Sequence, residues 1–365
     1  EKTKSKNDSP STPAQPAKPR KPSRKRRYRR KSGKHGKAER KPPEKKGEDL
    51  HKGWDESQFQ VAVVDGKTRF NDFDLPSPLM HAIHDLGFEY CTPIQAEILP
   101  STLEGRDATG RAQTGTGKTA AFLITIITRL LVNPLQEKRN QASPRVLILA
   151  PTRDLVMQIS KEAQDLSKYT SLNIVSVFGG MDYVKQRTQL ARGSVDIVVA
   201  TPGRLIDFKR RGDLTLKKVE TLIIDEADRM LDMGFIPDVR SIIYSTPQKD
   251  KRQTMLFSAT LDENIIRLAT QWTRKPVTVE IEREQVAVES VEQIVYIVTT
   301  DEKFSLLYNI IEKQNLERVL VFCNRRDEVR RLAEKLSRHG IRCSTLSGDV
   351  PQKKRVQRLE QFKAR

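Results

Sequence analysis

Short apolar runs alternate with helical periods along most of the chain from about residue 70. Five runs predict buried strands: Val146–Ala150, Ile174–Phe178, Asp196–Ala200, Thr221–Asp225 and Thr254–Ser258. Polar or glycine-containing turns follow them, usually with a helical segment next, as where Leu155, Ile159 and Ala163 recur at helical spacing. Nearly continuous apolar strands that alternate with helices are typical of a parallel sheet covered on both faces. The pattern therefore predicts a doubly wound α/β domain.

The same alternation restarts after an acidic, extended stretch at residues 280–290. It predicts strands over residues 293–298 and 319–322, and helices over residues 303–311 and 327–336. We expect three parts, a tail (1–66), a first domain (67–282) and a second domain (283–365) that ends before its sheet could close.

The first 50 residues carry almost no large apolar side chains, so they cannot bury enough surface to offset chain entropy and should be disordered. They hold 19 Lys and Arg against 6 Asp and Glu, so 19 − 6 = +13 of the net charge of +19 lies here and +6 in the rest. The run Lys21–Lys31 could hold phosphates, with Tyr28 free to stack on a base. A solvated, solubilising tail explains the same composition.

Three cysteines, Cys91, Cys323 and Cys343, lie far apart with no paired spacing. This argues against a zinc site or a disulfide framework and favours thiols in a reducing cytosol. No apolar stretch approaches the ~18 to 20 residues needed to cross a bilayer, and the first residues are too charged for a signal peptide. We therefore expect a soluble, cytoplasmic protein with no membrane partner, and nothing demands more than a monomer.

The strongest chemical signal is AQTGTGKT at residues 112–119, directly before an apolar helical segment. It fits the phosphate-loop pattern, in which glycines let backbone N–H groups face phosphate oxygens. Lys118 would reach the β- and γ-phosphates of ATP, and the Thr119 hydroxyl would bind Mg²⁺. A flexible Gly/Thr loop before a helix is the alternative. The predicted nucleotide-binding residues are Ala112, Gln113, Thr114, Gly115, Thr116, Gly117, Lys118 and Thr119.

A second signal, DEAD, follows the apolar run TLII. Ligands of open α/β sheets bind at the carboxyl ends of the strands, which puts Asp225 beside the phosphate loop. Asp225 would hold Mg²⁺ through water, and Glu226 would polarise the attacking water. Alone, such carboxylates usually mark a helix N-terminus. Together the two signals indicate a P-loop NTPase.

Further motifs lie around these two. Phe70 stands seventeen residues before Gly87, and the chain then reads GFEYCTPIQ (87–95), PTRDL (151–155), GG (179–180), TPGR (201–204) and SAT (258–260). The set resembles the DEAD-box RNA helicases over residues 70–365. The resemblance implies a RecA-like ATP-binding domain, followed by an incomplete second RecA-like domain and preceded by the disordered basic tail.

The resemblance also implies how the base of ATP is recognised. In the family's Q motif an aromatic ring stacks on adenine and a glutamine amide contacts the base edge, and these positions are Phe70 and Gln95, with Thr92 nearby. An amide offers both a donor and an acceptor, which suits adenine. Cys91 replaces the usual proline of the motif.

The motifs PTRDL, GG and TPGR are implied to grip the sugar-phosphate backbone of single-stranded RNA without reading its bases. The residues concerned are Pro151, Thr152, Arg153, Gly179, Gly180, Thr201, Gly203 and Arg204. Taken singly, each motif is also explained as a turn or a helix cap.

The SAT motif, with Ser258 and Thr260, is implied to link the ATP site to strand separation by contacting Asp228. A helix cap at Thr260 or Asp262 is the alternative, and both could hold together. With Lys118, Asp225 and Glu226, these residues complete the predicted catalytic set.

In the second domain, VFCN (321–324) and QKKR (352–355) resemble later family motifs, and SGDVPQKKR with CTPIQ points to the bacterial RhlB-type subgroup. The family's motifs V and VI, with its arginine finger, do not appear, so residues 1–365 alone should turn over ATP slowly, since such a finger contributes ~10³ to 10⁵ in rate.

The implied function is ATP-dependent RNA unwinding or remodelling with ATP and Mg²⁺, in RNA decay or ribosome assembly. Two alternatives remain open. The protein could be an ATP-gated RNA clamp or scaffold, for example in an RNA-degradation complex, or an RNA-annealing chaperone that acts through its basic tail.

Overall fold

The computed structural model describes residues 50–113, 115–135, 142–281 and 292–364. Thr114, the basic run Lys21–Lys31 and most of the acidic stretch at 280–290 lie outside these ranges. Residues 50–281 and 292–364 are described separately below.

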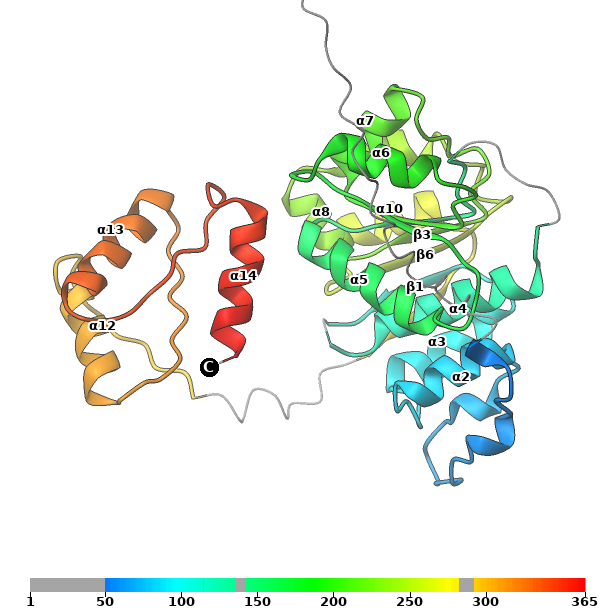
Figure 1. Cartoon of the computed structure of the whole chain (residues 1–365), viewed down its shortest axis with the longest axis horizontal. Helices are drawn as coiled ribbons and strands as arrows, with labels where there is room; N and C mark the ends of the chain where they lie inside the picture. Colours follow the sequence, from blue (N-terminus) through cyan, green and yellow to red (C-terminus); the bar gives the residue numbers. More distant parts are fainter. Residues whose placement is uncertain (1–49, 114, 136–141, 282–291, 365) are drawn as a thin grey trace, which may run out of the picture. The chain divides into compact units, whose positions relative to one another are not determined.

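A seven-stranded parallel sheet forms the centre of the first part, in the order β3-β4-β2-β5-β6-β1-β7 (Figure 1). Its strands are β1 (Ala108–Arg111), β2 (Val146–Leu149), β3 (Ile174–Val177), β4 (Ile197–Ala200), β5 (Thr221–Ile224), β6 (Gln253–Ser258) and β7 (Val277–Glu280). The five predicted strands correspond to β2 to β6 and are confirmed. Strands β1 and β7 were not predicted, because ATGR and VTVE lack a continuous apolar run.

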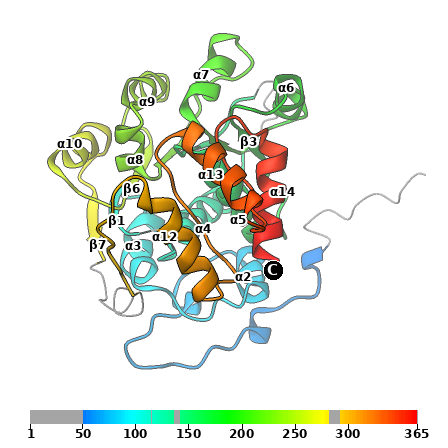
Figure 2. The same ribbon diagram turned by 90° about the vertical axis from the view of Figure 1, so that its left-hand side faces the viewer.

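Successive residues of each strand face opposite sides of the sheet, so each face has its own core. In β2, Val146 and Ile148 belong to one core, and Leu147 and Leu149 belong to the other. The first core is covered by α2 (Ser77–Asp85), α3 (Pro93–Leu103), α4 (Lys118–Val132) and α5 (Arg153–Leu166). The second is covered by α6 (Tyr183–Ala191), α7 (Pro202–Arg210), α8 (Ala227–Asp232), α9 (Ile236–Ile243) and α10 (Glu263–Trp272), as Figure 2 shows.

The segment before this domain differs from the expected tail over its last residues. Residues 50–66 were assigned to the disordered tail, but Phe59 is buried in the first core and Trp54 packs against it. One short 3₁₀ helix, Glu56–Gln58, lies within this stretch, and a second, Phe70–Asp72, follows it. The aromatic rings of Trp54 and Phe59 supply apolar surface that the preceding sequence lacks.

Residues 292–364 form α12 (Glu302–Lys313), α13 (Arg326–Arg338) and α14 (Gln352–Lys363). The first two confirm the predicted helices. The strands predicted over 293–298 and 319–322 are wrong, since neither segment is assigned as a strand. Ile297 and Phe322 are 99% and 91% exposed. An apolar run becomes a strand only when a neighbouring strand pairs with its backbone, and these segments have no such partner among the described residues.

No described helix is long and apolar enough to cross a membrane. Nor do the described residues gather three or more His, Cys, Asp or Glu side chains into a group that could hold a metal ion.

Close packing between β1 and β6 generates a prediction. A Cβ atom added to Gly110 would lie 2.7 Å from Cδ1 of Phe257. We expect Gly110→Ala to destabilise the protein by about 1–3 kcal/mol, because the rigid ring and the sheet backbone must shift. Urea unfolding measures this. Gly203→Ala, where a Cβ would meet open space, is the control, and equal stability of the two variants would contradict the packing argument.

Candidate functional site

A tight loop joins β1 to α4 and contains the predicted phosphate-binding residues. Gly115 and Gly117 have φ values of +90° and +91°, in the left-handed region that favours glycine. Ala112 donates its backbone N–H to the Ser258 carbonyl at 3.1 Å, and the Thr116 hydroxyl donates to the Gln113 carbonyl at 2.8 Å. The loop is therefore fixed to β6 at its start and closed on itself before α4 begins.

Gln95 connects this loop to the start of α3. Its Oε1 accepts a hydrogen bond from the Thr92 N–H at 2.8 Å, and its Nε2 donates to the Gly117 carbonyl at 3.0 Å. An amide has two N–H donors and two acceptor lone pairs, so one of each remains for a ligand. Any side chain at residue 117 would meet Gln95 and Thr92 at 2.7 Å, so only glycine fits this position.

Phe70, predicted to stack on adenine, is completely buried in the first core. Its ring centroid lies 6.4 Å from that of Phe88. A ring without an exposed face cannot stack on a base, so in this structure Phe70 is a core residue. The stacking role stays a prediction that requires the ring to move.

Lys118 and Asp225 form a buried ion pair at the carboxyl ends of β1 and β5. Lys118 Nζ lies 3.2 Å from Asp225 Oδ1, and the two side chains are 5% and 0% exposed. Burial raises the pKa of Asp225, and the Lys118 ammonium opposes this shift. Sequence motifs 107 residues apart (225 − 118) thus meet as the strand order predicts.

The second carboxylate oxygen, Asp225 Oδ2, is buried and has no hydrogen-bond partner among the described residues. A buried charged oxygen without a partner is costly unless a ligand or water satisfies it. Mg²⁺ commonly binds proteins through one or two oxygen ligands and keeps water and phosphate in its other positions. Asp225, with Thr119 in the first turn of α4, therefore fits Mg²⁺ bound together with a nucleotide.

Glu226 has a strained backbone, with φ 54° and ψ 54°, although it is not glycine. Such conformations cost about 1–3 kcal/mol and cluster at functional sites. Its N–H donates to Asp225 Oδ1 at 3.0 Å, and its side chain lines a pocket of about 200 Å³ with Lys118 and Thr119. Arg229 Nη1 donates to the Glu226 carboxylate at 3.3 Å, and the strained turn places Glu226 in the wall of this pocket.

The opposite wall of this pocket was missed from the sequence. It consists of Leu155, Gln158 and Glu162 on α5. Their spacing of three and four residues puts them on one helix face, a signal that could have revealed them. Burial, together with the charges of Asp225 and Asp165, raises the pKa of Glu162 to about 7.

Asp228 joins α8 to the end of β6, as predicted for the SAT motif. The Asp228 N–H donates to Ser258 Oγ at 3.3 Å, and Asp228 Oδ2 accepts from the Ala259 N–H at 3.1 Å. The cap of α10 is Asp262, which accepts from the Ile265 N–H at 2.9 Å. Thr260 lies exposed between the two.

The predicted RNA-binding loops follow β2, β3 and β4, at the same edge of the sheet. Thr152 caps α5 by accepting from the Leu155 N–H at 3.3 Å. The explanation of this motif as a helix cap therefore holds at Thr152. The Arg153 guanidinium packs over Gly180, where a Cβ would collide with it. Arg204 donates to the Met181 carbonyl at 3.3 Å, which joins the third loop to the second. Of the other members, Pro151, Gly179 and Thr201 lie in these same three loops, and Gly203 lies in the first turn of α7.

Comparison with known proteins matches both parts of the chain. The DEAD/DEAH box helicase family matches residues 92–268, and the helicase conserved C-terminal domain matches residues 302–365. The chain is 59% identical to the ATP-dependent RNA helicase RhlB of Pseudomonas aeruginosa and 60% identical to that of Pseudomonas putida. Both comparisons span 303 residues, 83% of this chain and 76% of each relative. A crystal structure of a DEAD box protein from Methanococcus jannaschii is similar, with a TM-score of 0.53, 31% identity, and coverage of 82% of this chain and 78% of that one.

The position of Gly117 predicts the effect of the smallest substitution. Gly117→Ala places a methyl group 2.7 Å from Gln95 Nε2 at a φ that alanine adopts poorly, so we expect nucleotide affinity to fall about tenfold or more. Titration with a fluorescent ADP analogue measures this. Gly115→Ala, which has a similar φ but open space around its Cβ, should lose less, and equal losses would mean that strain alone matters.

The raised pKa of Glu162 predicts a pH-dependent stability. Its protonated form favours the folded state, an effect that is complete below the ordinary glutamate pKa of about 4.3 and is lost as pH rises through about 7. Glu162→Gln stays neutral at every pH. We expect the variant to melt at a higher temperature than the parent near pH ~8.5 and at the same temperature near pH ~4. The control is Glu97→Gln, because Glu97 is exposed. If Glu162→Gln shifts the melting temperature equally at both pH values, the pKa of Glu162 is not raised.

Proposed function

Because this chain belongs to the DEAD/DEAH box family of ATP-dependent RNA helicases, we propose that it couples ATP binding and hydrolysis at the Lys118–Asp225 site to local unwinding or remodelling of RNA. The observation that supports this most directly is a continuous series of contacts. It runs from Gln95 through Gly117 and Lys118 to Asp225. The last carboxylate of the same motif, Asp228, contacts the SAT motif.

ATP binding at this site would move the Lys118 ammonium from Asp225 to the phosphates of the nucleotide. In the structure the ammonium neutralises Asp225, and bound β- and γ-phosphates would compete for it. Release of Asp225 frees a carboxylate for Mg²⁺, which would neutralise phosphate charge when bound. Glu226 faces the same pocket and would orient the attacking water, while Gln95 would offer its remaining donor and acceptor to adenine.

RNA would bind along the loops after β2, β3 and β4. Thr152, Gly180 and Thr201 offer backbone and hydroxyl groups there, and Arg153 and Arg204 offer guanidinium groups. These groups suit phosphates and ribose, which every RNA sequence presents. The proposed partner is therefore single-stranded RNA bound without sequence preference.

The setting that we propose for this activity is RNA decay or ribosome assembly in the cytoplasm.

An ATP-gated clamp uses the same site, but it would retain RNA without separating strands. Assays of RNA retention and of unwinding, each with ATP and with a non-hydrolysable analogue, separate the two. A clamp should retain RNA with the analogue and separate strands with neither nucleotide. Deleting residues 1–49 tests the annealing alternative: annealing would disappear while ATP turnover survives.

The proposed function predicts an RNA-dependent ATPase that needs Lys118. In the full-length protein, RNA should stimulate ATP turnover and single-stranded DNA should not. Lys118→Ala should abolish the turnover but spare RNA binding by the basic tail, because it removes the cation that holds the phosphates. Lys161→Ala, whose ammonium is exposed and paired with Asp165, is the control. Equal turnover with RNA, with DNA and without nucleic acid would leave a generic P-loop ATPase.

A further inference from the structure

Residues 50–64, here called the strap, lie directly before the Q-motif region and are fastened to α2 and α5 by stacked rings. The Trp54 ring stacks on His81 of α2, with centroids 4.7 Å apart and an interplanar angle of 11°. His81 in turn stacks on Tyr169, just after α5, at 3.6 Å and 3°. Neither contact belongs to a motif that the sequence singled out.

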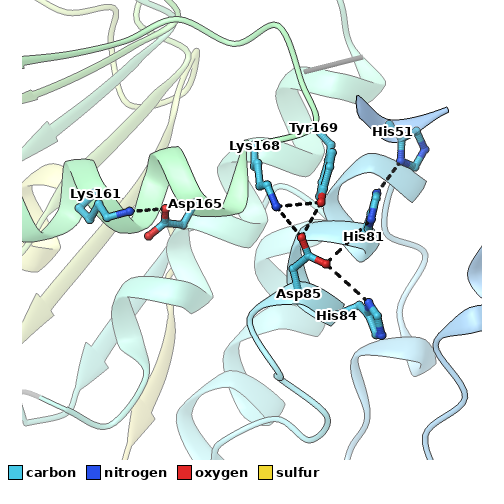
Figure 3. A network of polar contacts seen from close by, with 8 residues as sticks. All are labelled: His51, His81, His84, Asp85, Lys161, Asp165, Lys168 and Tyr169. Carbon is cyan, nitrogen blue, oxygen red and sulfur yellow. Dashed lines mark hydrogen bonds and ion pairs between the residues drawn. The ribbon is translucent and has the colours of Figure 1, made fainter. Parts of the chain in front are cut away.

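Polar contacts surround this stack (Figure 3). His51 Nδ1 lies 3.2 Å from His81 Nδ1. His51 Nε2 lies 3.3 Å from the Ser77 hydroxyl. Asp85 accepts from Lys168 at 2.7 Å and from the Tyr169 hydroxyl at 2.5 Å, which holds the outer ring in place. Burial lowers the pKa of His81, against the opposing effect of Asp85, so the central ring stacks as neutral imidazole near neutral pH.

Beyond Trp54, side chains of the Q-motif region bind the strap through its backbone. Asn71 Nδ2 donates to the Phe59 carbonyl at 3.1 Å, and Arg69 Nη1 donates to the Val61 carbonyl at 3.1 Å. The Tyr90 hydroxyl donates to the Ala62 carbonyl at 2.9 Å. Two of these donors flank Phe70 in sequence, and the third stands two residues before Thr92.

The same two stretches are also joined to each other. Arg69 and Tyr90 form an antiparallel bridge, and the Cys91 N–H donates to the Thr68 carbonyl at 2.8 Å. Thr92 then holds Gln95 Oε1, and Gln95 Nε2 holds the phosphate loop at Gly117. An unbroken series of contacts thus runs from the ring stack to the base-recognition amide.

We propose that the strap positions the Q motif for adenine recognition, with Trp54 as its main positioning residue. The inference rests on the proposed function in so far as Gln95 reads the base. The ring contacts of Trp54 in the described part of the chain are with His51, His81 and His84, none of which belongs to the nucleotide site. The Trp54 stack sets where the strap lies, and the strap's three carbonyls set where the loops bearing Phe70, Thr92 and Gln95 lie.

A purely structural strap would lower stability without changing which base is preferred, so the test is base selectivity. Affinities for fluorescent ADP and GDP are compared in the full chain for the parent, Trp54→Ala, Trp54→Phe and Trp272→Ala. Trp272 is the chain's other tryptophan, buried in α10 against the opposite core, and its removal supplies a matched loss of stability. Gln95→Ala reports separately whether the amide reads adenine.

We expect Trp54→Ala to weaken ADP binding about fivefold while GDP binding changes little, which corresponds to a coupling of about 1 kcal/mol. Trp54→Phe keeps a ring over His81 and should retain most of the preference for ADP over GDP. Trp272→Ala should lower the melting temperature and leave the ADP/GDP ratio unchanged.

Two failures are distinguishable. If Gln95→Ala leaves the ADP/GDP ratio unchanged, the proposed base recognition is wrong. If Gln95→Ala lowers the ratio but Trp54→Ala does not, or if Trp272→Ala lowers it equally, the strap is only a stabilising element and the inference is overturned.

Discussion

The parallel register of the sheet is the constraint on which the rest of the first part depends. Because all seven strands run in one direction, the segment that follows each strand emerges at the same edge. The phosphate loop after β1, the carboxylates after β5 and the SAT motif after β6 therefore meet there. Lys118 and Asp225 can form a buried pair only because β6 alone separates β1 from β5. The loops after β2, β3 and β4 continue the same edge, which gives the proposed RNA contacts a surface next to the nucleotide site.

A strand could be predicted from the sequence when its own residues carry the pattern that identifies it. Strands β2, β4, β5 and β6 are apolar runs buried on both faces, and β3 is an apolar run buried on one face, so composition alone reveals all five. Strand β1, with Gly110 at its centre, and the edge strand β7, with exposed Thr278 and Glu280, carry no such run. The apolar segments at 293–298 and 319–322 show the opposite failure. Their composition favours strands, but a strand is a property of a pair, and no partner is paired with them in the described residues.

The residues of the candidate site also fall into two groups, those that a sequence motif predicts and those whose place depends on packing. Gly117, Lys118 and Asp225 belong to short motifs whose spacing encodes their geometry, and the structure brings them together. Glu162 belongs to no motif, and its place opposite Lys118 depends on how α5 packs against α4. The burial of Phe70 is likewise set by neighbours distant in sequence, since an aromatic position does not reveal whether core or ligand covers the ring. The position of a side chain can be predicted from sequence when a short motif fixes it. When packing between distant segments fixes it, the position is known only from the structure.

The attachment of the strap through main-chain carbonyls affects how its sequence can vary over evolution. The groups that Asn71, Arg69 and Tyr90 bind are carbonyls of residues 59, 61 and 62, and every amino acid supplies the same carbonyl. Neutral drift at 61 and 62 therefore leaves the attachment intact, whereas one change in a receiving side chain breaks it. Apart from the rings of Trp54 and Phe59, the information that fixes the strap therefore lies in the domain. Extensions that keep these two rings but otherwise differ in sequence would bind the same three donors.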